Sequence, residues 1–162
     1  MSHQRALAAS SSSSVPSARQ PDSPLRGMAR AVGVVFLLVG VLGFVPGITA
    51  DHDELHVMGP ESQAMLLGLL QVSVLHNALH LLYGVAAFAC SATPSAAHKY
   101  LVLGGLGYLV LALIGTASMA AGLDNPIPVN GWDDLLHYGL AVGMVGLGYV
   151  GYRRHRARWG TF

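Results

Sequence analysis

Residues 28–48 read MARAVGVVFLLVGVLGFVPGI, an almost uninterrupted run of apolar side chains that ends at Pro46 and Gly47. A helix needs about 20 apolar residues to cross the hydrocarbon core of a bilayer. This run has that length, and its only charged side chain, Arg30, lies close to its start. The run therefore predicts a membrane-spanning helix.

Three further stretches predict spanning helices. Residues 101–123 and 132–152 resemble the first run in length and composition. Residues 64–90 are also apolar, but at 1.5 Å per residue they would reach about 40 Å, too long for a core of about 30 Å. We therefore expect a break near Ser73, which can cap a helix running to Cys90. Residues 61–73 would then form an interfacial or re-entrant piece, or else belong to the second helix.

The composition of the whole chain supports a membrane protein. Of its 162 residues, 52% are hydrophobic and only 10% are charged, whereas a soluble domain carries about 25% charged residues. We predict an all-α, integral membrane four-helix bundle over residues 28–152. Residues 1–27 are rich in Ser, Ala and Pro and predict a disordered tail, and residues 153–162 form a basic tail.

Charge is strongly segregated along the chain. The nine Lys and Arg side chains lie in the N-terminal tail and the start of the first span, in the connector between spans two and three, or in the C-terminal tail. Seven of the eight acidic side chains lie in the other two connectors or at the start of span four. The positive-inside rule then predicts a multi-pass protein of the plasma (inner) membrane with cytoplasmic N- and C-termini. Because the positive-inside rule already accounts for the positions of the basic residues, these residues do not predict nucleic-acid binding.

A weak internal repeat relates the second and fourth spans. Residues 76–88, HNALHLLYGVAAF, align with residues 133–145, DDLLHYGLAVGMV, which pairs His80 with His137. The chain could therefore consist of two helical hairpins in parallel repeat. Gly139 and Gly143 stand four residues apart, a spacing that lets helices approach closely. We expect this pair to pack within the bundle, or to mediate a homo-oligomer or contact with a membrane-protein partner.

Polar side chains cluster near the start of these two spans. His76 and His80 share one helical face because they are four residues apart, and the corresponding part of span four carries two carboxylates and a histidine. Such groups are costly against lipid and should face the bundle interior. The expected cluster, in the outer half of the membrane, comprises His76, Asn77, His80, Asp133, Asp134 and His137.

Two interpretations of this cluster need no organic cofactor. In the first, the cluster is a structural hydrogen-bond network in which Asp133 or Asp134 accepts from His137 and Asn77 bonds to His80. In the second, it binds a metal, because imidazole and carboxylate groups suit Zn²⁺ or Cu²⁺. The metal ligands would be His76, His80, His137 and Asp133.

Two further interpretations involve haem or protons. His80 and His137 could be axial haem ligands on two helices, with Gly84 and Gly139 making room. The histidines, with a carboxylate, could instead respond to cations or relay protons. The sequence contains no catalytic triad and no phosphate-binding loop, so it does not predict an enzyme. A structural protein, or an accessory subunit of a larger membrane complex, is the rival functional class.

Four motifs resemble one bacterial, actinomycete-type family of four-helix membrane proteins, known as domain of unknown function 4383. They are FLLVGVLGFVPGIT, LLGLLQVSVLHNALHLLYG, YLVLALIG and DDLLHYGLAVGMVGLG. The resemblance covers residues 28–152 and implies the same membrane architecture, but it brings no established activity. The chain departs from the family pattern in two places: Ser73 and Val74 replace an Asn-Pro pair, and Asp134 replaces an Asn.

Overall fold

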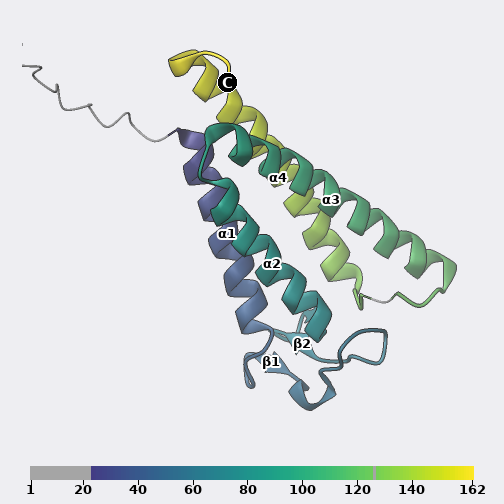
Figure 1. The fold of residues 1–162 in the computed structure, drawn as a ribbon. Coiled ribbons are helices and arrows are strands. Elements are labelled where there is room, and N and C mark those ends of the chain that lie inside the picture. The colour runs from purple at the N-terminus through teal and green to yellow at the C-terminus, as the bar shows by residue number, and fades with distance from the viewer. Residues whose placement is uncertain (1–22, 126) are drawn as a thin grey trace, which may run out of the picture.

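The computed structural model describes residues 23–125 and 127–162, in which four helices dominate (Figure 1). The elements in chain order are α1 (Pro24–Leu42), β1 (Thr49–Ala50), a 3-10 helix η1 (His52–Glu54), β2 (Met65–Leu66), β3 (Leu70–Gln71), α2 (Val74–Cys90), α3 (Pro94–Ala121) and α4 (Gly131–Trp159). The predicted all-α, four-helix class is confirmed. Most of the predicted N-terminal tail, residues 1–22, lies outside the described residues.

The predicted break near Ser73 is confirmed. Helix α2 begins at Val74, and the Ser73 hydroxyl accepts a hydrogen bond from the backbone N–H of His76 at 3.1 Å. This is the usual N-cap arrangement, in which a side-chain oxygen satisfies a free N–H of the first turn. The helix ends at Cys90, so it has 17 residues and a length of about 25 Å.

The other helices extend beyond their predicted starts or ends. Helix α1 begins four residues early, at Pro24, a residue suited to a first turn. Helix α3 begins seven residues early because Thr93 caps it, accepting from the N–H of Ala96 at 3.2 Å. Helix α4 continues to Trp159, so most of the predicted basic tail is helical. In the other direction, α1 stops at Leu42, six residues before the predicted end.

Residues 61–73 form neither a helix nor an extension of α2. Strands β1, β2 and β3 make a small antiparallel sheet in that order, with Thr49 opposite Leu66 and Met65 opposite Gln71. The turn between β2 and β3 has positive φ at Leu67 (55°) and Gly68 (67°), as tight hairpin turns require. The sheet covers the end of the molecule at which α2 begins (Figure 1).

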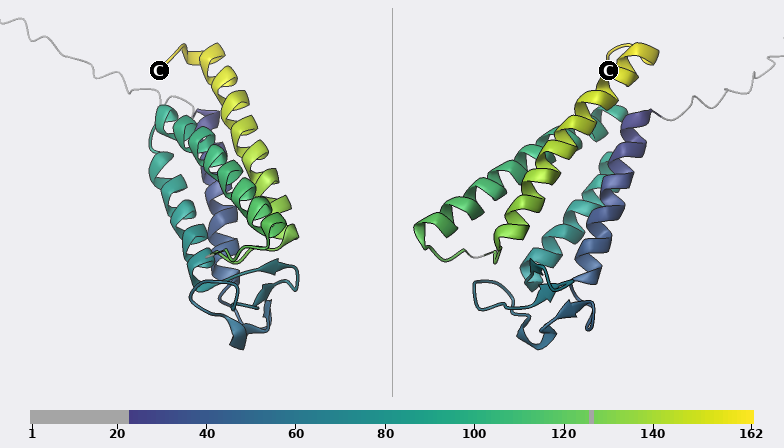
Figure 2. Two further views of the ribbon diagram at one scale, coloured as in Figure 1. Left: turned by 90° about the vertical axis from the view of Figure 1, so that its right-hand side faces the viewer. Right: turned by 180° about the vertical axis from the view of Figure 1, so that it is seen from behind.

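The helices form two hairpins. Helix α1 packs along α2, and α3 packs along α4, while the two hairpins meet near the turn between α2 and α3 and diverge toward the other end (Figures 1 and 2). Helices α2 and α4 run in the same direction, as the internal repeat predicts. The hairpins are also tied near the chain termini, where Ser23 hydrogen-bonds to Nδ1 of His155 at 3.0 Å.

The close helix approaches occur at glycines other than the predicted pair. In the first hairpin, a Cβ on Gly33 would lie 2.7 Å from the Cβ of Ala87. In the second, a Cβ on Gly105 would lie 3.0 Å from the carbonyl oxygen of Ala141. Gly139 and Gly143 have no atom of a neighbouring element within 4 Å of such a Cβ. The expectation that they pack within the bundle is therefore wrong: they lie on the exposed side of α4.

The distribution of polarity is that of a membrane protein. Three helices, α1, α3 and α4, are long and apolar enough to cross a bilayer by length and composition. Large apolar side chains on their outer faces are widely exposed, for example Leu38, Leu103 and Val142. The interior, in contrast, holds buried histidine, asparagine and aspartate side chains. An apolar exterior of this extent is typical of a surface covered by lipid.

Basic and acidic side chains lie at opposite ends of the described molecule. The end containing the start of α1, the turn between α2 and α3 and the C-terminus carries Arg26, Lys99 and the arginines of late α4 (Figure 1). We call this the basic end. The opposite, acidic end contains the sheet and the connector between α3 and α4, and it carries Asp51, Asp53, Glu54, Glu61, Asp124, Asp133 and Asp134.

Candidate functional site

Three of the predicted site residues converge between the two hairpins. His76, His80 and His137 each offer a ring nitrogen, and these nitrogens all lie within 4.8 Å of one another. Their side chains are 3%, 3% and 1% exposed, respectively. We call these three residues the histidine cluster. The two histidines that the repeat aligns, His80 and His137, thus belong to one site.

Local structure places each ring. The Ser73 cap fixes the start of α2, so His76 and His80 fall one turn apart, and their rings stack with centroids 4.7 Å apart and planes 24° apart. His137 approaches from α4, with its ring centroid 5.6 Å from that of His76. Helix α4 is fixed in turn by a capping box between Asn130 and Asp133. Two capped helix starts therefore set the geometry of the cluster.

Backbone carbonyls orient two of the rings. Nδ1 of His76 lies 3.2 Å from the carbonyl oxygen of Gln71, and Nδ1 of His80 lies 3.1 Å from that of His76. Because a carbonyl oxygen only accepts, Nδ1–H must be the donor in both bonds. In the neutral rings, Nε2 then carries a free lone pair.

The remaining ring nitrogens of the cluster have no partner within the described chain. Nε2 of His76, Nε2 of His80 and both nitrogens of His137 are buried and have no hydrogen bond of acceptable geometry to a described residue, although the backbone carbonyl of Pro128 lies near the ring of His76. Buried polar groups are nearly always hydrogen-bonded, and each exception calls for an explanation such as an ion or water. Here four such atoms occur in one cluster.

Asp133 does not join the cluster but caps α4 and holds the sheet. One oxygen, Oδ2, accepts from the backbone N–H groups of Asn130 and Gln71, both at 2.9 Å. The carbonyl of Gln71 is the group that accepts from His76. The Asp133 carboxylate is thus linked to the cluster through strand β3, and it acts on His76 as a positioning group.

Asp134 faces helix α3. Its Oδ2 accepts from the hydroxyl of Thr116 at 3.3 Å, and that hydroxyl also contacts the hydroxyl of Tyr138 at 3.2 Å. Its other oxygen, Oδ1, is buried against Gly115 and has no hydrogen-bond partner among the described residues. Asp134 therefore forms a second polar site, between α3 and α4.

Asn77 lies against the end of helix α1. Its side chain is fully buried and packs on Gly43, and neither amide atom forms a hydrogen bond with the described part of the chain. The predicted Asn77–His80 bond is absent, and so is the predicted bond from His137 to a carboxylate. The structural hydrogen-bond network that the sequence suggested is therefore not formed by these residues.

Aromatic side chains surround the histidine cluster. Phe36 stacks on His80 with centroids 5.8 Å apart, and Tyr108 lies 5.4 Å from the ring of His137. Tyr83 completes this wall, 4.9 Å from Tyr108. Tyr83 could have been found from the sequence, since it follows His80 by three residues on the same helical face. Phe36 and Tyr108 lie on neighbouring helices, and no spacing connects them with the histidines.

A small cavity reaches the cluster from the gap between α2 and α3. It has a volume of about 200 Å³ and is lined by His76, Leu79, Tyr83, Gly107, Tyr108, Leu111 and Ile127. Pockets for organic ligands usually measure about 300–1,000 Å³. The cavity therefore suits an ion or a few water molecules better than a large cofactor.

Haem does not fit these residues. The space at Gly84 is taken by Leu37 of α1, whose Cγ would lie 2.6 Å from a Cβ at that position. Gly139 lies on the exposed side of α4 and does not line the cluster. Neither glycine predicted to make room for the macrocycle does so, and Tyr108 lies against both His80 and His137.

The cluster does fit a transition-metal ion. Zn²⁺ binds imidazole nitrogen at about 2.0–2.1 Å, which in a tetrahedral site separates two ligand nitrogens by about 3.3 Å. The nitrogens of the cluster lie within 4.8 Å, so rotations of the rings that move them by about 1–1.5 Å would close the site. Carbonyl acceptors behind ligating histidines, as at His76 and His80, are typical of metal centres.

The comparisons with known proteins identify the family of the chain. Among curated proteins and among solved structures, none matches this chain. One family matches residues 26–150, which include most of α1, all of α2 and α3, the larger part of α4 and every residue of the histidine cluster. The chain belongs to that family, which is described as a domain of unknown function (DUF4383).

Proposed function

We propose that this chain is a membrane protein that binds a divalent first-row metal ion, Zn²⁺ or Cu²⁺, at the histidine cluster. The observation that carries the proposal is the convergence of three buried imidazole rings, each of which has at least one nitrogen without a hydrogen bond to a described residue. His76, His80 and His137 are the ligands, and the fourth position is left to water. Asp133, predicted as a ligand, takes the role of a positioning group.

The energetic argument favours a bound ion. Leaving a buried hydrogen-bonding group without a partner costs about 1–3 kcal/mol, and the histidine cluster contains four such atoms. One ion with three imidazole ligands would engage three of them at once. Imidazole suits Zn²⁺ and Cu²⁺ in particular, and the donor set of three histidines with an open position is familiar from metal sites.

A response to protons is the second candidate function. It is favoured by Asp134, whose Oδ1 is buried between α3 and α4 without a hydrogen-bond partner among the described residues. In this alternative, water molecules in the cavity beside His76 would bridge the histidines. The two candidates differ in one measurable respect, because only the first requires a stoichiometric metal.

The membrane and orientation belong to the same proposal. The chain would lie in the plasma (inner) membrane of a bacterium, with both termini cytoplasmic. The segregation of charge between the basic and acidic ends supports this arrangement. The histidine cluster lies in the half of the molecule nearer the acidic end, so metal would enter from outside the cytoplasm.

The test measures metal bound to the purified, untagged protein in detergent. After equilibration with Zn²⁺ or Cu²⁺ and removal of free metal, we expect about one ion per wild-type chain. The variants His80→Gln and His137→Gln should each lose it, because an amide is a poor ligand for these metals but still forms hydrogen bonds. His56→Ala is the matched control, since that side chain is exposed and lies in the connector between α1 and α2.

Folding of each variant is checked by thermal unfolding without metal. Metal that binds only the native state should raise the unfolding midpoint of the wild type, because 100-fold excess over Kd adds about 2.7 kcal/mol. The glutamine variants should keep the midpoint measured without metal and lose the shift. Wild-type protein that takes up no metal, or glutamine variants that bind as much as wild type, would refute the metal site.

A further inference from the structure

A long apolar groove lies on the membrane-facing side of the molecule, between α2 and α3. Its lining starts at Cys90 and Ala96, on either side of the turn that joins these helices, and its volume is about 540 Å³. Its lining residues are Leu82, Tyr83, Ala86, Cys90, Ala96, Lys99, Tyr100, Leu103 and Gly104. Leu82 and Leu103 on its rims are more than half exposed, so the groove is open to lipid.

Lys99 is the only charged side chain that lines this groove. The hydroxyl of Tyr100, which also lines the groove, donates to the backbone carbonyl of Tyr83 at 3.1 Å. Every acidic side chain in the described part of the chain lies at the acidic end, on the far side of the membrane-spanning region. Among the described residues, Lys99 therefore has no Asp or Glu side chain to pair with at this end.

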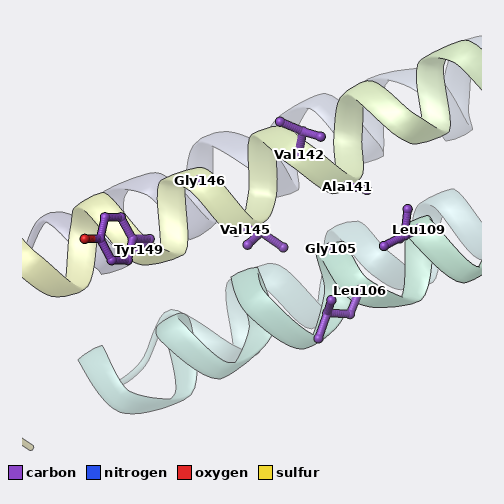
Figure 3. A pocket seen from close by; sticks show the side chains of 8 residues that line it. All are labelled: Gly105, Leu106, Leu109, Ala141, Val142, Val145, Gly146 and Tyr149. Atoms are coloured by element: carbon purple, nitrogen blue, oxygen red, sulfur yellow. The ribbon is translucent and has the colours of Figure 1, made fainter.

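A second groove provides a comparison without charge. It lies between α3 and α4, has a volume of about 470 Å³ and is shown in Figure 3. Its walls are apolar, with Leu106 and Leu109 from α3 facing Val145 from α4, and its one polar side chain is Tyr149. No charged side chain lines this groove; Arg153, which donates to the hydroxyl of Tyr149 at 3.1 Å, lies outside its lining.

We propose that the groove between α2 and α3 is a binding site for an anionic phospholipid. An acyl chain lies in the groove over Tyr83, Ala86 and Gly104, and the phosphate pairs with the ammonium group of Lys99. The proposal rests on charge complementarity, because an amphiphile with a negative headgroup matches a groove that is apolar along its length and positive at one end. It is independent of the histidine cluster and of any metal.

The experiment compares the binding of phosphatidylglycerol and phosphatidylcholine to the delipidated full chain by native mass spectrometry. We expect the wild type to prefer phosphatidylglycerol by about five-fold, the ratio that one lysine near a lipid phosphate supplies. Lys99→Gln should abolish the preference and Lys99→Arg should retain it. Arg156→Gln is the matched control, since it removes one exposed positive charge from the same end but outside the groove.

The native Cys90 locates the bound lipid, because it is the only cysteine and it lines the groove. In phosphatidylcholine nanodiscs, adding phosphatidylglycerol should slow the reaction of Cys90 with N-ethylmaleimide in the wild type and in Arg156→Gln, but not in Lys99→Gln. A cysteine in the uncharged groove, Leu106→Cys in a Cys90→Ser background, should show no such slowing.

Three results would overturn the proposal. The first is equal affinity of the wild type for the two lipids, and the second is an undiminished preference in Lys99→Gln. The third is protection of Cys90 that rises with the number of chains per nanodisc and is indifferent to phosphatidylglycerol, because a second copy of the chain would then fill the groove.

Discussion

Asn77 is a fully buried amide with no hydrogen bond to any described residue, and it packs on Gly43 at the end of α1. Leucine has nearly the same branched shape and no polar atoms. Because removing an unsatisfied polar group removes its desolvation cost, we expect Asn77→Leu to raise the free energy of unfolding by about 1–2 kcal/mol. Thermal or denaturant unfolding in detergent measures this change.

The same variant also tests whether Asn77 contributes to metal binding. Because its side chain faces α1, Asn77→Leu should leave metal binding at the histidine cluster unchanged. A variant that is less stable than wild type, or that loses metal, would mean that the amide has a partner that the described residues do not supply. Asn77→Asp is the comparison, since a carboxylate at this position should be strongly destabilising.

At this scale the sequence predicted the histidines well and their neighbours poorly. The four-residue spacing of His76 and His80, and the repeat that aligns His80 with His137, depend only on positions within helices. Gln71 and Tyr108 could not be found in this way. Gln71 contacts His76 because a tight turn folds β3 back, and Tyr108 faces His137 because of how α3 packs on α4.

At the scale of elements, glycines decide where helices approach each other closely. Gly33, at such an approach, and Gly139, on an exposed face, allow the same substitution to be compared at a packed and an open position. Alanine at Gly33 would place its Cβ 2.7 Å from the Cβ of Ala87, which can move only with its backbone. We expect Gly33→Ala to destabilise the protein by about 1–3 kcal/mol. Gly139→Ala meets nothing within 4 Å, so it should be neutral or stabilise by up to about 1 kcal/mol through helix propensity.

Unfolding midpoints of the two glycine variants, measured in the same detergent, give the comparison. Equal effects would show that the packing between α1 and α2 yields easily at Gly33. A strong loss in Gly139→Ala together with a change of oligomeric state would instead place Gly139 in an interface between copies of the chain.

A second prediction for the elements concerns strand β3 as a link between α4 and the histidine cluster. Asp133→Ala removes the acceptor for the N–H groups of Asn130 and Gln71. We expect it to lower stability by about 1 kcal/mol through the lost cap. Because Gln71 then no longer holds His76 firmly, it should also weaken metal binding by about 10-fold.

Asp124→Ala is the control for this prediction, because it removes the same charge from the same end without touching the cap. If the two variants weaken metal binding equally, the effect of Asp133 is one of general electrostatic attraction. Asp133→Asn retains an acceptor oxygen and should lie between Asp133→Ala and the wild type in a calorimetric titration with Zn²⁺.

The elements themselves were predictable where a local signal exists. Ser73 marks the start of α2 because capping is a property of a few adjacent residues. The hydropathy runs found the other helices but not their ends, since Thr93 and the arginines after Tyr152 extend α3 and α4 into polar sequence. The sheet was missed because its strands have two residues each, too few for an alternating pattern.

For the whole molecule, apolar side chains cover the outside of the helices as well as much of the core, and buried polar groups lie among them. The exposed surfaces of the helices need only be apolar, so they impose few constraints on packing. Beside the histidine cluster, the aromatic rings of Phe36, Tyr83 and Tyr108 pack against one another. Charges gather at the two ends, and their segregation is the basis of the proposed orientation.

The last prediction tests on which side of the membrane each end of the molecule lies. In a Cys90→Ser background, Glu61→Cys lies at the acidic end and Arg158→Cys at the basic end. A membrane-impermeant maleimide added to intact bacteria, with the outer permeability barrier opened where there is one, should label Glu61→Cys. It should label Arg158→Cys only after the plasma membrane is permeabilised, because basic segments remain in the cytoplasm. The reverse pattern would place both termini outside, and the histidine cluster would then take its metal from the cytoplasm. Labelling of both positions in intact cells would put the two ends on the same side, so α2, the shortest of the four helices, would not complete a span.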